Sequence, residues 1–341
     1  MRTPISLLQS FGHSRRAAGL RPSPGLRLAA HRGLVAIPVL FGVTLLTFFV
    51  LDLLPGSAAR QLLGADATPE QVAALEVRLG LNRPARERYL HWLTGAVTGD
   101  LGKSIASNQP VTALVAERLP VTVELVALAF ALSLALSVPA ALFAAHRPNR
   151  LVDRLTMLLS MGGLSMPSYV LAPVLVLIFS VNLTLFPSIG FKPPSAGVLE
   201  NLHSLVLPTV AIALPLLCFY TRFLRGDVVE QMNGEDYVVT AVAKGIGPWR
   251  VLVRHALRNS LFGLLTLVGL NFGALIGGTV IVERIFALPG LGQLLLQAIN
   301  TRDAPIVQAI VLLLAVVTVL ANLCVDLLYA ALDPRIRYGD R

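Results

Sequence analysis

Few residues of this chain have the types and spacing that catalysis or ligand binding requires. The triplet GKS at 102–104 is typical of the end of a phosphate-binding loop, but that motif also needs a glycine where the chain has Val97. The motifs HExxH, GxSxG and CxxC do not occur. Cys218 and Cys324 each lie alone in an apolar run, which favours buried thiols over a disulfide or a metal site. We therefore expect no catalytic residue, no metal and no cofactor bound by this chain.

Three carboxylates lie within or beside long apolar runs: Asp52, Glu124 and Asp326. A charge in hydrocarbon costs at least ~2.5 kcal/mol, so such residues are functional candidates. Asp52 stands at the end of its run, which favours an interfacial position. Glu124 could line a pathway or hold a neighbouring helix, and Asp326 is expected to pair with another span. The three do not form the chain of carboxylates that a proton relay needs.

The composition places these carboxylates in a membrane. The sequence is 55% hydrophobic and 14% charged with a mean hydropathy of +0.72, against roughly 45–50% and about 25% in soluble domains. Six runs approach or exceed the roughly 20 apolar residues that a span requires. They lie at 33–54, 119–145, 155–181, 204–224, 261–282 and 306–332. We predict an all-α integral membrane protein with six transmembrane helices.

Prolines and small residues interrupt these runs. Pro167 and Pro173 fall in the third, where each removes a backbone donor and favours a kink. The pair Gly162-Gly163 allows a neighbouring helix to approach closely.

The distribution of Lys and Arg predicts the orientation. With six spans both termini lie on one side, and that side carries 18 of the 28 basic residues. The other side carries 10, most of them in the long segment 55–118, which counts little in the positive-inside rule. We therefore expect the basic tail 1–32, the loop 225–260 and the C-terminal segment 333–341 to be cytoplasmic. Topology also accounts for the net charge of +9, so no nucleic-acid partner is expected.

The segment 55–118, which we call the insert, is predicted to be extracytoplasmic and helical. Thr68 is placed as an N-cap with Pro69 at the first helical position, and the pattern continues to Gly80. The insert could cap the outer mouth of a pathway or serve as a passive connector.

A charged segment, 235–259, lies between the apolar runs 204–224 and 261–282. We call this segment the hairpin. Val238, Ala241 and Val242 are spaced as on one helix face, and Lys244-Gly245 is a typical helix end. After Gly247-Pro248, an apolar stripe runs from Trp249 to Leu257, while arginines repeat every fourth residue at 250, 254 and 258 on another face. Two short helices are predicted. They could bind anionic membrane lipid or dock a cytoplasmic partner.

The hairpin resembles the cytoplasmic EAA loop of ATP-binding-cassette (ABC) importer permeases, in the form found in dipeptide and oligopeptide transporters. The likeness extends from about residue 31 onward, through LPGSAA, LPVTVEL, MPSYVLAP, VERIFALPGLGQLLLQ and NLCVDLLYAALDPRIRYG. It implies the type I importer permease (MetI-like) fold, with 119–332 as the permease core. It also implies a place in the bacterial cytoplasmic (inner) membrane.

The resemblance further implies that the hairpin couples the permease to ATPase subunits. The matching positions are Glu235, Asp236, Tyr237, Val239, Thr240, Ala241, Ala243, Lys244, Gly245, Arg250, Arg254, His255, Ala256, Leu257, Arg258 and Asn259. Val239 departs from the pattern, which usually has a Glu or an Arg there. Apolar packing by Val238, Val239 and Val242 could replace the polar contact.

The implied partners are a second homologous permease, two ABC ATPases that bind ATP and Mg, and an extracytoplasmic peptide-binding protein. Closure of the ATPases would open the spans alternately to each side, and the chain would catalyse no covalent step. A permease for nickel complexes, glutathione or another small solute is the nearest alternative. A stand-alone channel or proton-coupled carrier is the alternative from another class, and the hairpin and the lack of a carboxylate relay oppose it.

Overall fold

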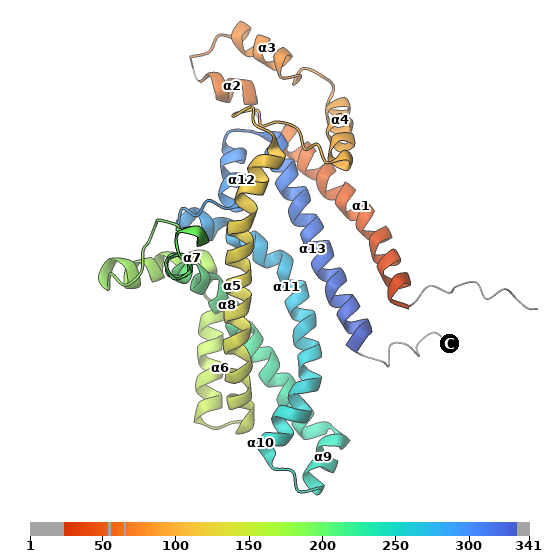
Figure 1. The fold of residues 1–341 in the computed structure, drawn as a ribbon, viewed down its shortest axis with the longest axis vertical. Coiled ribbons are helices and arrows are strands. Elements are labelled where there is room, and N and C mark those ends of the chain that lie inside the picture. The colour runs from red at the N-terminus through yellow and green to blue at the C-terminus, as the bar shows by residue number, and fades with distance from the viewer. Residues whose placement is uncertain (1–23, 54–55, 65, 333–341) are drawn as a thin grey trace, which may run out of the picture.

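Helices make up the regular secondary structure of the computed structural model, which describes residues 24–53, 56–64 and 66–332 (Figure 1). The longer helices are α1 (Pro24–Leu53), α5 (Val111–His146), α6 (Leu151–Leu164), α8 (Val198–Gly234), α11 (Leu257–Ile285) and α13 (Ala304–Leu332). The shorter ones are α2 (Ala58–Leu63), α3 (Pro69–Arg78), α4 (Ala85–Thr98), α7 (Ser168–Leu175), η1 (Val176–Asn182), η2 (Pro194–Ala196), α9 (Asp236–Ala243), α10 (Pro248–Val251), η3 (Leu252–Ala256) and α12 (Leu291–Asn300). The all-α prediction is confirmed. The predictions for 1–23 and 333–341 concern segments outside the described residues.

Several helices are long and apolar enough to cross a membrane. Five such stretches occur in the described residues: His31–Leu53, Val111–His146, Val198–Gly234, Pro248–Gly273 and Ala304–Leu328. A sixth span results only if Leu151–Leu164 and Ser168–Asn182, which are bent by 99° to each other, are counted together. The count of six therefore stays a prediction.

The third predicted span, 155–181, is bent far more sharply than the predicted kink. Helix α6 ends at Leu164, and α7 begins at Ser168 after a sharp bend. Pro167 explains the break, because it has no backbone N–H and disfavours the helical conformation at Met166. η1 then continues from α7 as a π-helix.

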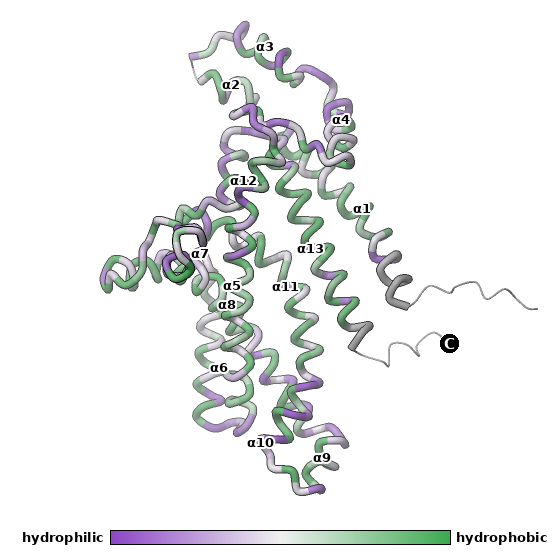
Figure 2. Tube along the Cα trace, viewed as in Figure 1, coloured by the Kyte–Doolittle hydropathy of each residue, from purple (hydrophilic) through white to green (hydrophobic). Residues whose placement is uncertain are grey.

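The insert and the hairpin lie at opposite ends of the bundle (Figure 1). Hydrophilic residues concentrate at these ends, while α1, α5 and α13 are largely hydrophobic between them (Figure 2). Within the insert, the predicted helix is confirmed as α3, where Thr68 and Gln71 form a reciprocal capping box. We refer below to the insert end and the hairpin end.

The bundle interior divides into three apolar clusters along its length. The middle cluster joins α5, α7, α8 and α11, with Leu125, Leu205 and Ala211 fully buried. A second cluster at the insert end joins α5, α12 and α13. A third at the hairpin end joins α5, α8, η3 and α11. The hairpin therefore contacts the spans through an apolar cluster that is separate from the cluster at the insert end.

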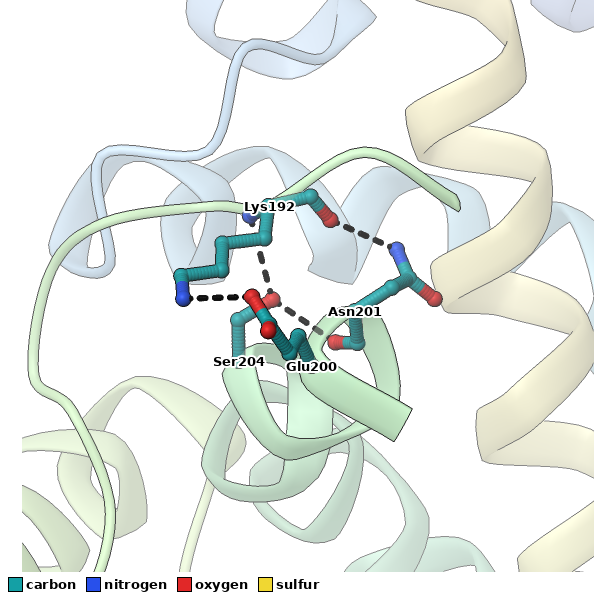
Figure 3. A network of polar contacts seen from close by, with 4 residues as sticks. All are labelled: Lys192, Glu200, Asn201 and Ser204. Atoms are coloured by element: carbon teal, nitrogen blue, oxygen red, sulfur yellow. Dashed lines mark hydrogen bonds and ion pairs between the residues drawn. The ribbon is translucent and has the colours of Figure 1, made fainter. Parts of the chain in front are cut away.

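The loop before α8 is fastened to that helix by polar contacts. Lys192 Nζ lies 2.6 Å from Glu200 Oε2, and the buried Asn201 donates from Nδ2 to the Lys192 carbonyl at 2.8 Å (Figure 3). The Lys192 N–H donates to Ser204 Oγ at 3.3 Å. Since Lys192 and Glu200 are both exposed, the backbone contacts of Asn201 and Ser204 stabilise the loop more than the ion pair does.

Gly163 shows why a small residue is needed in α6. A Cβ atom at this position would overlap Cys218 Sγ on α8. We expect Gly163→Ala to lower the thermal stability of the detergent-solubilised chain, by about 1–3 kcal/mol in the free energy of unfolding. The double variant Gly163→Ala, Cys218→Ala should regain most of this loss, because the obstructing sulfur is gone. Equal melting temperatures for the wild type and Gly163→Ala would contradict the close contact.

Candidate functional site

The hairpin begins at Glu235, as predicted, directly after α8. Helix α8 continues to Gly234 because no proline interrupts it between 225 and 233, so the first ten residues of the predicted cytoplasmic loop 225–260 are helical. Helix α9 follows and ends at Ala243, after which Gly245 has a φ of +76° that favours glycine. The Gly245 and Ile246 N–H groups donate to the Val242 and Ala241 carbonyls and close the turn.

The second arm of the hairpin was predicted to be a separate short helix, and this prediction was wrong. α10 passes into the π-turn η3 and directly into α11, so one helical rod runs from Pro248 to Ile285. No glycine or proline occurs between Pro248 and Gly263 to end it. A displacement of the hairpin is therefore carried directly into α11.

The inner face of the hairpin is a small apolar core. Val238 and Ala241 of α9 pack with the fully buried Val251 of α10, and Met232 and Ile246 flank them. Burial of each large side chain contributes about 1.5–3 kcal/mol. This core fixes the two arms relative to each other.

The outer face of α9 exposes valines. Val239 and Val242 are 67% and 55% exposed, whereas Val238 is only 3% exposed. The suggestion that Val238 contributes to an outer contact was therefore wrong, because its side chain packs in the hairpin core. Asp236, Thr240, Ala243 and Lys244 are also exposed.

The hairpin is joined to the end of α5 by aromatic contacts. The Trp249 ring stacks on Phe143 with the centroids 5.7 Å apart, and His146 meets it edge-on at 5.1 Å. Leu252 and Ala256 are buried in the cluster with α5 and α8. Arg250, Arg254, Arg258 and Asn259 are exposed, and His255 and Leu257 are half-buried. The predicted division into an apolar and a basic face is thus present.

Tyr237 fastens α9 to the end of α8. Its hydroxyl donates to Gln231 Oε1 at 2.6 Å. Burial raises the pKa of Tyr237 above its ordinary value, and the carboxylates of Glu235 and Asp227 raise it further. The phenol therefore remains a hydrogen-bond donor at neutral pH.

A buried ion pair near the hairpin was missed from the sequence. Arg225 of α8 donates from Nε to Asp153 Oδ1 of α6 at 2.8 Å and from its terminal nitrogen to Oδ2. The Asn149 N–H also donates to Asp153 Oδ2 at 2.7 Å. From the sequence, Arg225 was counted only among the basic residues that set topology, and no sequence signal joined it to Asp153, 72 residues away in the chain.

The carboxylates in the apolar runs have different surroundings. Asp326 pairs with Arg32 of α1, with 2.8 Å between Oδ2 and Nε. Glu124 is half-buried on α5 and has no polar partner within the described part of the chain. Asp52 pairs with Arg88 of α4 beside the Phe48 ring. A cavity of about 680 Å³ lies there, between the insert, the end of α1 and the start of α13.

Comparison with known proteins gives matches over most of the chain. Residues 137–338 match the family described as "Binding-protein-dependent transport system inner membrane component", and residues 25–126 match its N-terminal counterpart. A Brucella abortus (strain 2308) protein, assigned by name to a peptide transport system as a permease, is 43% identical over 303 residues, 89% of this chain and 96% of the relative.

Two further relatives carry more specific names. The dipeptide transport system permease protein DppB of Alkalihalophilus pseudofirmus is 36% identical over 333 residues, 92% of this chain and 100% of that protein. The glutathione transport system permease protein GsiC of Escherichia coli O6:H1 is 36% identical over 313 residues, 92% of this chain and 99% of that protein.

Proposed function

The chain belongs to the family of binding-protein-dependent transport system inner membrane components, and we propose that it moves dipeptides and oligopeptides inward across the membrane. It is an integral inner-membrane protein and a permease subunit of an ABC transport system, not itself an enzyme. Such a system also contains a binding protein and ATPase subunits. Three relatives with peptide, dipeptide and glutathione in their names support a peptide-like substrate.

The hairpin is the observation that carries the mechanism we propose. It exposes two valines on a rigid apolar core, and its second arm runs without a break into α11. A surface of this kind fits a cleft on a cytoplasmic ATPase. ATP and Mg bind to two such ATPases, and their closure moves the hairpin, α11 and, through Trp249, the end of α5.

A second homologous permease completes the pathway in this proposal. The proposal counts the bent pair as one of six spans, with both termini and the hairpin in the cytoplasm and the insert outside. The excess of Lys and Arg on the hairpin side supports this orientation. The insert end then faces the peptide-binding protein. Glu124 has no polar partner among the described residues, and lipid would not solvate its charge. In this proposal its side chain therefore faces the pathway.

Transport by the complete complex tests this function. The permease, its partner permease, both ATPases and the binding protein are placed in proteoliposomes, and uptake of a radiolabelled dipeptide is followed with ATP or with a non-hydrolysable analogue. We expect uptake only with ATP and the binding protein. Dipeptide uptake by this chain alone, without ATPases, would instead support a stand-alone carrier.

Glutathione is the second candidate substrate, because its permease in Escherichia coli is as similar to this chain as the dipeptide permease is. Competition separates the two. Excess unlabelled dipeptide should suppress uptake of the labelled dipeptide, whereas excess glutathione should not. Suppression of dipeptide uptake by glutathione at a lower concentration than the unlabelled dipeptide requires would assign glutathione.

A further inference from the structure

Helix α12 lies at the insert end, between the last turn of α11 and the start of α13 (Figure 1). The first N–H groups of any helix have no partner within that helix. In α12 the first three, on the buried Leu291 and Gly292 and the half-buried Gln293, are satisfied by side chains from other helices. The Leu291 N–H donates to Thr122 Oγ1 of α5 at 2.8 Å. The Gly292 and Gln293 N–H groups donate to Glu283 Oε2 of α11, at 2.7 and 3.2 Å.

The two side chains are themselves joined. Thr122 Oγ1 donates to Glu283 Oε1 at 2.7 Å, so both carboxylate oxygens of Glu283 are occupied. Glu283 is fully buried and Thr122 is 4% exposed. Glu283 also lies at the positive end of the α12 dipole, which favours its carboxylate form. We call Thr122, Glu283 and the N–H groups of Leu291, Gly292 and Gln293 the α12 anchor.

Two glycines make the close approach possible. A Cβ at Gly290 would overlap the Glu283 carboxylate. A Cβ at Gly292 would overlap the backbone of Val280. No larger residue fits at either position, so the helix start is built around the carboxylate.

The other end of α12 is held by a second buried carboxylate. Asp303, directly before α13, is 1% exposed and accepts from Ser104 Oγ at 2.5 Å and from the Ala106 N–H at 3.1 Å. Ser104 and Ala106 belong to the end of the insert. Between the two carboxylates, α12 packs on Val111 and Val115 of α5. Helix α12, the start of α5 and the end of the insert therefore form one block.

A hydrogen-bonded anchor depends on the orientation of its groups, whereas an apolar contact does not. Apolar side chains can slide and still remain buried, but rotation of α12 would leave buried N–H groups and a carboxylate without partners. The anchor therefore favours one discrete arrangement of the insert end.

We propose that Thr122 and Glu283 are positioning residues for transport, which hold α12 on α5 and α11 in the resting arrangement and so oppose ATP hydrolysis until the binding protein docks. This inference rests on the proposed function, in which the insert end meets the binding protein. By thermodynamic linkage, loosening the anchor lowers the cost of leaving the resting arrangement. Hydrolysis without the binding protein should then rise.

ATPase activity of the complete complex in proteoliposomes tests the proposal, with Thr122→Val as the main variant. Valine has nearly the same shape but neither accepts from Leu291 nor donates to Glu283. We expect ATP hydrolysis without binding protein to rise about fivefold or more. Thr122→Ser keeps the hydroxyl and should behave as the wild type. Glu283→Gln keeps an acceptor for Gly292 and Gln293 and should give a smaller rise.

Hydrogen exchange of the α12 amides gives an independent readout. Exchange of the segment 288–300 should accelerate in Thr122→Val but not in Thr122→Ser. Unchanged exchange, or faster exchange with unchanged ATPase activity, overturns the proposal. If the complex with Thr122→Val does not assemble, ATPase activity and hydrogen exchange of the Glu283→Gln complex test the proposal instead. If the wild-type complex is not stimulated by peptide-loaded binding protein, the proposed function fails, while the exchange data still show whether the anchor holds α12.

Discussion

Replacing Arg225 by leucine is expected to lower the free energy of unfolding by about 3 kcal/mol, because it leaves the Asp153 carboxylate buried without its counter-charge. The Asp153 side chain is only 4% exposed, and its remaining hydrogen bond comes from the Asn149 N–H. Thermal unfolding of the detergent-solubilised chain measures the effect. Transport should fall with it, because the pair joins α6 to α8 shortly before the hairpin.

The two single variants should differ in a diagnostic way. The Arg225 side chain is 21% exposed and can extend toward water once Asp153 is replaced by asparagine. Asp153→Asn should therefore lower the free energy of unfolding by less than Arg225→Leu does. The double variant should recover more than half of the loss seen in Arg225→Leu, since no unpaired charge remains. Additive losses in the double variant would show that the ion pair does not couple the two helices.

Much of the helical architecture could be predicted from the sequence because its signals are local. Long apolar runs marked the spans, and Thr68 and Pro69 marked the start of α3. The bend at Pro167 was only half predicted. The proline indicated a kink, but the 99° angle depends on how α7 packs on α8 and α11, which no local pattern encodes.

The candidate site was predicted in outline for the same reason. Periodicity identified the hairpin and its two faces, but it treated the second arm as a separate helix. The suggestion that Val238 contributes to an outer contact came from the resemblance at Val239. The inward position of Val238 depends on its contact with Val251, which lies beyond the turn.

The buried polar residues could not be predicted at all. Thr122 and Glu283 are 161 residues apart in the sequence, and their partners are backbone N–H groups that carry no sequence signature. Glu283 falls one residue past the predicted span 261–282. A carboxylate is common at the boundary of a membrane, so this one did not stand out in the sequence. Only the folded arrangement brings it to the start of α12.

Changing both exposed valines of α9 to aspartate is expected to weaken ATPase binding about 30-fold, which corresponds to about 2 kcal/mol at the centre of an interface. Val239 and Val242 project outward from the hairpin core, so two carboxylates there would have to be desolvated on docking. The dissociation constant between the purified permease and its ATPase measures this loss. ATP-dependent dipeptide uptake should fall in parallel.

The fold itself should tolerate this change, because neither valine belongs to the buried core of the hairpin, which is formed by Val238, Ala241 and Val251. The melting temperature of the permease is therefore expected to stay near that of the wild type. The matched control is Val77→Asp, Val97→Asp in α3 and α4, since it places the same two charges on valines that are 62% and 82% exposed at the opposite end of the bundle. That variant should bind the ATPase as the wild type does. Normal ATPase affinity in the double valine variant would place the coupling contact elsewhere, with the exposed arginine face of the second arm as the remaining surface of the hairpin.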